Sequence, residues 1–225
     1  MNFALILAGG TGSRAGSALP KQFVAAGGRR LFWRSVEAFR TFDPECRIVL
    51  IVHPDYLKRW DELFGDEERE LGFEIAKAGG GVSRIESVKN GLEFIRGLLT
   101  EGQRPEARVF IHDSARPGVS AELIRRGSEA VGRGRGAVPV ITLADSIRRL
   151  DGSGSKAVAR KDYVAVQTPQ VFMFEDIYKA YSQVSADADF TDDASVAENS
   201  GIPITLYEGA PENFKVTTPE DFKRL

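Results

Sequence analysis

Cysteine and histidine are scarce in this chain of 225 residues, which contains one cysteine, Cys46, and two histidines, His53 and His112. A single cysteine excludes an internal disulfide framework and any metal site that needs several thiolates. Two histidines leave little for a zinc site or for a catalytic triad.

Long apolar runs are also missing. No stretch of 18 apolar residues occurs, so a transmembrane helix is not expected. Residues 3–8 are apolar, but this run is too short for the core of a signal peptide and a glycine turn follows it at once. The net charge is −2, which offers no basic surface or tail for bulk nucleic acid. We expect a cytoplasmic protein without a nucleic-acid or membrane partner.

Short apolar runs alternate with amphipathic segments along the chain. Strands are predicted at residues 3–8, 48–53, 73–76, 109–112, 137–142 and 204–207. Several of these runs are apolar throughout, which is typical of strands buried on both faces of a parallel sheet. The length suits one large α/β domain, and we expect a single domain over residues 1–225.

Helical periodicity separates these runs. Residues 83–99 carry apolar side chains at steps of three and four, and Ser83 followed by Glu86 predicts a capped start. A second such face covers residues 174–184, and a last helix is expected to begin at Thr218. The alternation predicts a doubly wound α/β fold with a mostly parallel, Rossmann-like sheet and a ligand site beyond the carboxyl ends of its strands.

Residues 145–163 depart from this rhythm. They contain Asp151-Gly152-Ser153-Gly154-Ser155 between two charge-rich arms, which predicts a hairpin or a flexible excursion. Two interpretations stay open: a solvated loop, or a protruding β-arm at about residues 143–166 that embraces another subunit.

The first apolar run ends in a glycine-rich turn. Leu7-Ala8-Gly9-Gly10-Thr11-Gly12-Ser13-Arg14 is followed by Leu19-Pro20-Lys21-Gln22. Glycines let the main chain approach a ligand and present several N–H groups to one anion. Arg14 and Lys21 could neutralise the remaining charge of a triphosphate, although a purely structural turn is the alternative.

Two familiar nucleotide-binding patterns do not fit this turn. A dinucleotide fingerprint needs a third glycine where Ala15 stands, and the acid expected for the ribose is missing from Gly27-Gly28-Arg29-Arg30. A P-loop needs Gly-Lys-Ser or Gly-Lys-Thr after four intervening residues, and the chain has none. A nicotinamide dehydrogenase is therefore disfavoured.

The glycine turn, together with Pro20-Lys21-Gln22-Phe23, resembles the nucleotide-binding signature of sugar-nucleotide pyrophosphorylases and cytidylyltransferases. It is most similar to the group of 2-C-methyl-D-erythritol 4-phosphate cytidylyltransferase and ribitol 5-phosphate cytidylyltransferase. Further blocks that resemble this family follow in the family's order, among them Val109-Phe110-Ile111-His112-Asp113-Ser114-Ala115-Arg116-Pro117 and Gln167-Thr168-Pro169-Gln170. The resemblance covers nearly the whole chain.

The resemblance implies a nucleotidyltransferase fold and an Mg²⁺-dependent transfer of CMP from CTP to a polyol phosphate, with release of pyrophosphate. The implied acceptor is 2-C-methyl-D-erythritol 4-phosphate, of non-mevalonate isoprenoid biosynthesis. Ribitol 5-phosphate, or another polyol or sugar phosphate, is the alternative. The resemblance also implies a homodimer. From a different class, the chain could be a regulator that binds nucleotide without turnover.

The resemblance assigns roles residue by residue. The residues implied to act on the phosphates are Arg14, Lys21 and Lys215. The residues implied to bind the nucleotide are Ala8, Gly9, Gly10, Gly12, Gly81, Arg84 and Ser87. The residues implied to bind the acceptor are Arg116, Ser146, Arg160, Thr168 and Thr191. The implied magnesium ligand is Asp113.

Some positions have plain structural alternatives or depart from the family pattern. Asp113 ends a predicted strand and could be a turn residue, Thr191 is expected to cap the next helix, and His112 is expected to be packed and hydrogen-bonded. Ser114 and Ser146 replace the family's alanine and threonine. Glu212 stands where an aspartate is frequent, which puts a second metal ligand there in doubt.

Overall fold

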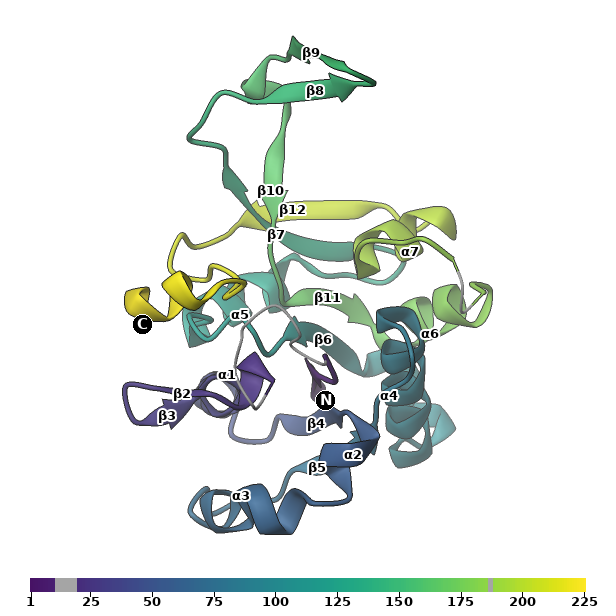
Figure 1. Ribbon diagram of the computed structural model, residues 1–225. Coiled ribbons are helices and arrows are strands. Elements are labelled where there is room, and N and C mark those ends of the chain that lie inside the picture. The colour runs from purple at the N-terminus through teal and green to yellow at the C-terminus, as the bar shows by residue number, and fades with distance from the viewer. Residues whose placement is uncertain (11–19, 186–187) are drawn as a thin grey trace.

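The computed structural model describes residues 1–10, 20–185 and 188–225. Within these residues the centre of the molecule is an eight-stranded sheet with the order β10-β7-β11-β6-β1-β4-β5, and β12 pairs with β7 (Figure 1). Its strands are β1 (Asn2–Ala8), β4 (Arg47–Val52), β5 (Ala76–Gly79), β6 (Arg108–Asp113), β7 (Gly136–Thr142), β10 (Val164–Val166), β11 (Gln170–Met173) and β12 (Ile204–Glu208).

Most neighbouring strands run in parallel. The central strand β1 is parallel to both β4 and β6, β5 is parallel to β4, and β12 is parallel to β7. The strand β11 lies antiparallel between β6 and β7, and β10 is antiparallel to β7. The predicted α/β fold with a mostly parallel sheet is confirmed.

Helices connect the strands and cover both faces of the sheet. The α-helices are α1 (Leu31–Phe42), α2 (Pro54–Leu57), α3 (Trp60–Arg69), α4 (Arg84–Leu98), α5 (Ala121–Ala130), α6 (Phe174–Ser182) and α7 (Asp193–Asn199). The 3₁₀ helices are η1 (Lys21–Phe23), η2 (Glu101–Glu106), η3 (Arg160–Asp162) and η4 (Pro219–Arg224). The predicted helix after Thr218 is thus a 3₁₀ helix, η4.

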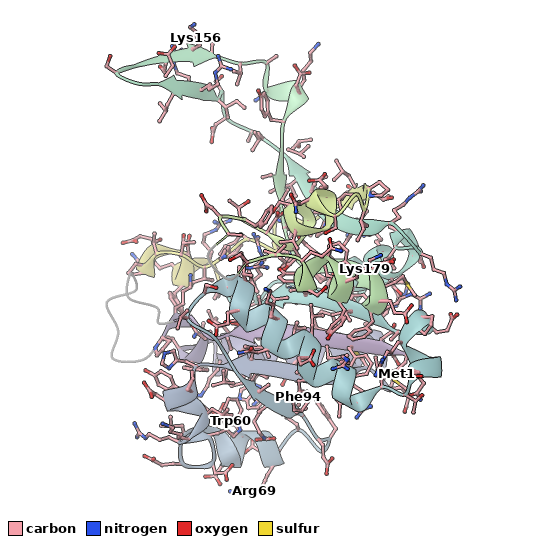
Figure 2. All side chains as sticks on the ribbon, turned by 90° about the vertical axis from the view of Figure 1, so that its right-hand side faces the viewer. Met1, Trp60, Arg69, Phe94, Lys156 and Lys179 are labelled. Atoms are coloured by element: carbon pink, nitrogen blue, oxygen red, sulfur yellow. The ribbon has the colours of Figure 1, made fainter. Side chains whose placement is uncertain are left out.

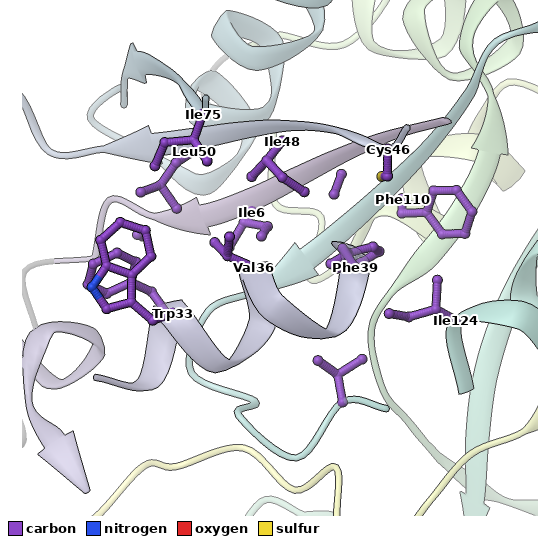
Figure 3. Packing of buried hydrophobic residues seen from close by; sticks show 14 of the residues in the cluster. Ile6, Trp33, Val36, Phe39, Cys46, Ile48, Leu50, Ile75, Phe110 and Ile124 are labelled. Atoms are coloured by element: carbon purple, nitrogen blue, oxygen red, sulfur yellow. The ribbon is translucent and has the colours of Figure 1, made fainter. Parts of the chain in front are cut away.

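Alternating side chains of β1 enter separate apolar clusters on the two faces. Ile6 packs with Val36 and Phe39 of α1 in one cluster (Figure 3), whereas Leu5 packs with Val88 of α4 in the other. Successive residues of a strand point to opposite faces, so a strand inside the sheet must be apolar at every position. This accounts for the uninterrupted apolar runs in the sequence.

The strand predicted at residues 73–76 is misplaced. The strand β5 begins only at Ala76 and continues to Gly79. The apolar residues before it are explained by packing, because Ile75 is buried in the cluster beneath α1 and the ring of Phe73 lies under the guanidinium of Arg40. An apolar run that packs from a connection looks the same in the sequence as a short strand.

The predicted hairpin is present and stands away from the sheet. Strands β8 (Arg148–Asp151) and β9 (Gly154–Ala157) pair in antiparallel fashion, and Gly152 between them has φ of 59°, a conformation that favours glycine. The arm projects from the rest of the molecule in Figure 1, and Figure 2 shows Lys156 near its far end. Among the described residues, no helix combines the length and apolar character that crossing a bilayer requires.

Candidate active site

A cleft of about 710 Å³ opens where β1, β4, β5 and β6 end. Parallel strands bring their carboxyl ends to the same edge of a sheet, and ligands of α/β proteins bind there. The volume lies within the range of small-molecule sites. Its lining residues are Leu7, Gly9, Gly10, Lys21, Gln22, His53, Gly81, Val82, Ser83, Arg84, Ser87, Asp113, Ser114, Ala115, Lys215 and Thr217.

The described residues of the glycine turn, Gly9 and Gly10, line this cleft. The side-chain amide of Gln22 donates to the carbonyl oxygens of Ala8 at 2.8 Å and of Gly10 at 2.6 Å. Gln22 is buried, and its two bonds hold the start of the turn, from Ala8 to Gly10, against η1. No role was predicted for Gln22, although it directly follows Lys21 in the sequence. Arg14 and Gly12 lie outside the described residues.

A second wall is the connection from β5 to α4. Ser87 accepts a hydrogen bond from the Gly81 N–H at 3.0 Å, and Glu86 accepts one from the Val82 N–H at 2.8 Å. Ser83 caps α4 by accepting from the Glu86 N–H, as the sequence predicts. These bonds shape a turn that packs beside Gly9, since a Cβ added at Gly9 would lie 3.7 Å from the Ser87 hydroxyl.

The carboxylate of Asp113 lies at the floor of the cleft among three cations. Lys215 Nζ contacts its Oδ2 at 2.7 Å, Arg84 Nε lies 3.8 Å from Oδ1, and Arg116 Nε lies 4.0 Å from Oδ2. Burial raises the pKa of Asp113, but Lys215, Arg84 and Arg116 outweigh it and hold that pKa well below its usual range. The carboxylate is therefore charged at neutral pH.

Lys21 lines the same cleft and contacts the segment that carries Lys215. Its ammonium donates to the Val216 carbonyl at 2.7 Å, next to Lys215. The fold thus brings Lys21, Asp113 and Lys215 together, as the sequence analysis expected of the residues around a triphosphate. Backbone N–H groups and two ammonium groups at one cleft provide a site for a polyphosphate.

Arg116 and Thr168 pack around Asp113 and do not line the cleft. The Arg116 guanidinium donates to the carbonyls of Asn213 at 3.0 Å and Val166 at 3.4 Å. Thr168 accepts from the Asp113 N–H at 3.1 Å and its hydroxyl lies 3.1 Å from His112 Nδ1. Arg116 and Thr168 therefore fix the backbone and side chains that surround the Asp113 carboxylate.

The other predicted acceptor residues, Ser146, Arg160 and Thr191, are not among the residues that line the cleft. Ser146 and Arg160 flank the hairpin, where Arg160 donates to the Ala144 carbonyl. Thr191 does not cap α7, so that interpretation is wrong. Asp192 is the cap and accepts from the Ser195 N–H at 3.0 Å, because a carboxylate placed directly before the helix reaches its N–H groups better than a side chain one residue earlier.

Whether Mg²⁺ fits this site depends on which carboxylates line the cleft. The described residues contain no cluster of three histidine, cysteine, aspartate or glutamate side chains, and the exposed Glu212 is not among the residues that line the cleft. Mg²⁺ is commonly held by one or two carboxylates together with water and substrate phosphates. The single charged carboxylate of Asp113 therefore suits Mg²⁺ when water and substrate phosphates supply the remaining ligands.

The segment that carries Lys215 is tied to the loop after β6. Val216 N–H donates to the Ala115 carbonyl at 2.8 Å, and a Cβ added at Gly118 would lie only 1.9 Å from the Glu212 carbonyl oxygen. Since the clash is with backbone, any side chain at residue 118 must push the two segments apart. The absence of a side chain at Gly118 is what lets Lys215 reach Asp113.

Replacing Gly118 by alanine is expected to reduce kcat by about 10²-fold, since displacements near 1 Å can cost that much. The measurement is pyrophosphate release from CTP, the reaction that the family resemblance implies. Gly102→Ala is the matched control, because a Cβ there meets nothing within 4 Å. A wild-type rate for Gly118→Ala would show that the contact does not position Lys215.

His112 is fully buried beneath the site, as expected for a packed residue. Burial lowers its pKa to about 4, from an ordinary value near 6.5. Between these values only the unfolded chain binds the proton, so the free energy of unfolding should fall by roughly 2 kcal/mol between pH 7 and pH 5. Urea unfolding at both pH values tests this, and His112→Gln should lack that loss. An equal loss in the variant would contradict the prediction.

Known proteins match this chain over nearly its full length. The family model described as 2-C-methyl-D-erythritol 4-phosphate cytidylyltransferase matches residues 3–224. The protein of that name from Bacteroides fragilis is 45% identical over 223 residues, which cover 98% of this chain and 95% of the relative. The one from Bacteroides thetaiotaomicron is 42% identical over 97% of this chain and 95% of the relative.

Solved structures agree with these matches. The crystal structure of 2-C-methyl-D-erythritol 4-phosphate cytidylyltransferase from Thermus thermophilus superposes with a TM-score of 0.73 at 27% identity, over 98% of this chain and 95% of the other. A crystal structure of 4-diphosphocytidyl-2C-methyl-D-erythritol synthase gives a TM-score of 0.77 at 25% identity, over 99% and 96%.

Proposed function

Because the chain belongs to the 2-C-methyl-D-erythritol 4-phosphate cytidylyltransferase family, we infer that it transfers CMP from CTP to 2-C-methyl-D-erythritol 4-phosphate in isoprenoid biosynthesis. The second product is pyrophosphate. The observation that supports this chemistry most directly is the convergence of Lys21, Lys215 and Asp113 at one cleft beyond the strand ends.

The reaction needs positioning and charge more than a protein nucleophile. A phosphate oxygen of the acceptor attacks the α-phosphorus of CTP, a new P–O bond forms, and the bond to the bridging oxygen of pyrophosphate breaks. Lys21 and Lys215 would offset the charge that develops on the phosphates. The backbone N–H groups of the glycine turn would hold these phosphates in line with the acceptor. Arg14 is proposed to join them.

The remaining cleft residues are proposed to bind the nucleotide and a metal ion. Gly81, Arg84 and Ser87 form the wall at which the cytosine would lie. Asp113 would hold Mg²⁺, which supplies charge neutralisation between the phosphates when it is bound. Lys215 contacts Asp113 at 2.7 Å and is well placed to move from this carboxylate to a bound α-phosphate.

An assay of pyrophosphate release with CTP tests the function. The acceptors to compare are 2-C-methyl-D-erythritol 4-phosphate and ribitol 5-phosphate, and the first is expected to give the higher kcat/KM. A higher value for ribitol 5-phosphate would overturn the choice of acceptor. Tight CTP binding without pyrophosphate release in either case would instead indicate a regulator.

The β8–β9 arm is proposed to join two copies of the chain. Leu150 on the hairpin is 81% exposed, and Tyr163, Val164 and Val166 below it are also exposed. Exposed apolar residues on a projecting hairpin favour burial against a partner. In such a dimer, Arg160 could reach the acceptor phosphate in the cleft of the other subunit, which its position outside its own cleft allows.

Mixing two inactive variants is expected to restore activity if Arg160 acts across the dimer. A heterodimer of Arg160→Ala and Lys215→Ala subunits has one site with both residues intact, so random reassociation of equal amounts should give about a quarter of the wild-type rate. Each variant reassociated with itself is the control. No recovery, with heterodimers verified by mass spectrometry, would place Arg160 in its own subunit's site.

A further inference from the structure

A buried ion pair stands behind the active-site cleft. Asp193, the first residue of α7, is completely buried and accepts from Arg84 with both oxygens, Nη1 to Oδ1 at 2.9 Å and Nη2 to Oδ2 at 2.6 Å. Arg84 is the first residue of α4 and lines the cleft. A buried carboxylate is costly unless it is paired and hydrogen-bonded, so this bidentate pair is held firmly.

A third helix completes the arrangement. The hydroxyl of Tyr181, on α6, donates to Asp193 Oδ1 at 2.6 Å and is itself buried. Burial raises the pKa of Tyr181 well above its usual value, and the neighbouring Asp193 raises it further, so the hydroxyl remains a neutral donor. Asp193 is thus fixed from two sides, and it fixes Arg84 in turn.

The bonds to Asp193 limit how Arg84 can contact Asp113. Both terminal nitrogens of Arg84 are bonded to Asp193, and the contact with Asp113 is made through Nε, which lies 3.8 Å from Oδ1, beyond hydrogen-bond distance. An unrestrained guanidinium this close would pair with the carboxylate through its two-nitrogen fork and cover both oxygens. A hard cation such as Mg²⁺ needs those oxygens.

We propose that Asp193 and Tyr181 are positioning residues that keep the Arg84 fork away from Asp113, so that the Asp113 carboxylate stays open to a divalent cation. This inference rests on the proposed function, in which Asp113 holds Mg²⁺. Arg84 supplies positive charge to the site, while its bonds to Asp193 fix the orientation of its guanidinium. Lys215, on the opposite oxygen and 43% exposed, is the cation that can leave.

The factor by which Mg²⁺ tightens CTP binding tests this proposal without relying on turnover. It is the ratio of the CTP Kd values in EDTA and in saturating Mg²⁺, measured by calorimetry on the full chain. Contacts of Arg84 that do not involve the metal cancel in this ratio. In Asp193→Asn the ratio should fall by about 10- to 100-fold, the usual cost of losing a residue that orients a metal ligand. Tyr181→Phe should lower it less, in the same direction.

The double variant Arg84→Met/Asp193→Asn separates positioning from general damage. It removes the competing guanidinium together with its partner, so the ratio should return towards the wild-type value. A double variant as impaired as Asp193→Asn, or an unchanged ratio in Asp193→Asn, would overturn the proposal. If Asp193→Asn does not fold, an unchanged ratio in Tyr181→Phe overturns it.

Asp113→Asn distinguishes failure of the proposed metal site from failure of this inference. If Mg²⁺ tightens CTP binding equally in the wild type and in Asp113→Asn, the metal ligand is misassigned. If Asp113→Asn abolishes the effect of Mg²⁺ and Asp193→Asn leaves it intact, the metal site stands and the positioning role of Asp193 is wrong.

Discussion

Replacing Lys215 by alanine is expected to lower kcat by about 10²- to 10³-fold, the effect of losing one preorganised charged or hydrogen-bonding group. The ammonium contacts Asp113 at 2.7 Å within the cleft, and the side chain is too exposed to contribute much to the core. The fold should therefore persist, as circular dichroism and thermal unfolding would show, while pyrophosphate release falls.

Lys21→Ala should have an effect of similar size. Lys21 lines the same cleft and donates to the Val216 carbonyl, so its loss removes a charge at the phosphates and a tie to the Lys215 segment. Lys223→Ala, at an exposed position of η4, is the matched control and should turn over normally. Near-normal kcat in both Lys21→Ala and Lys215→Ala would refute the proposed site.

Replacing Asp113 by asparagine is expected to have an equally large effect, about 10²- to 10³-fold on kcat, because the proposed metal ligand, a charged carboxylate beside three cations, becomes a neutral amide. The rate that remains should depend little on Mg²⁺ concentration. The variant should also be less stable at low salt, since Lys215, Arg84 and Arg116 lose their common counter-charge.

Glu212→Gln is the control for that experiment. Glu212 occupies the position where the family resemblance left a second metal ligand open, but it is exposed and does not line the cleft. Its Mg²⁺ dependence should match that of the wild type. A rate for Asp113→Asn that still rises steeply with Mg²⁺, together with a loss in Glu212→Gln, would move the metal site to Glu212.

Local features of this protein could be predicted because their causes are local. The apolar runs around Leu5 and Leu50 indicate strands buried on both faces, and Ser83 indicates where a helix begins, since a cap needs only the next three residues. The hairpin at Gly152 is also set by its own turn residues. The short strands β10 and β11 escaped prediction because three or four residues show no clear periodicity.

The amino-acid pattern was sufficient to predict an α/β sheet and a glycine turn at its edge with Lys21 beside it, and the family resemblance added Asp113 and Lys215 as candidate residues. It could not show that Lys215 would contact Asp113 across 102 positions, or that Asp193 would occupy the fork of Arg84 across 109. Such contacts depend on how helices and loops pack over the sheet, which periodicity and capping do not encode. The tertiary structure therefore decided that Lys215 contacts Asp113 in the cleft, whereas the terminal nitrogens of Arg84 are bonded to the buried Asp193.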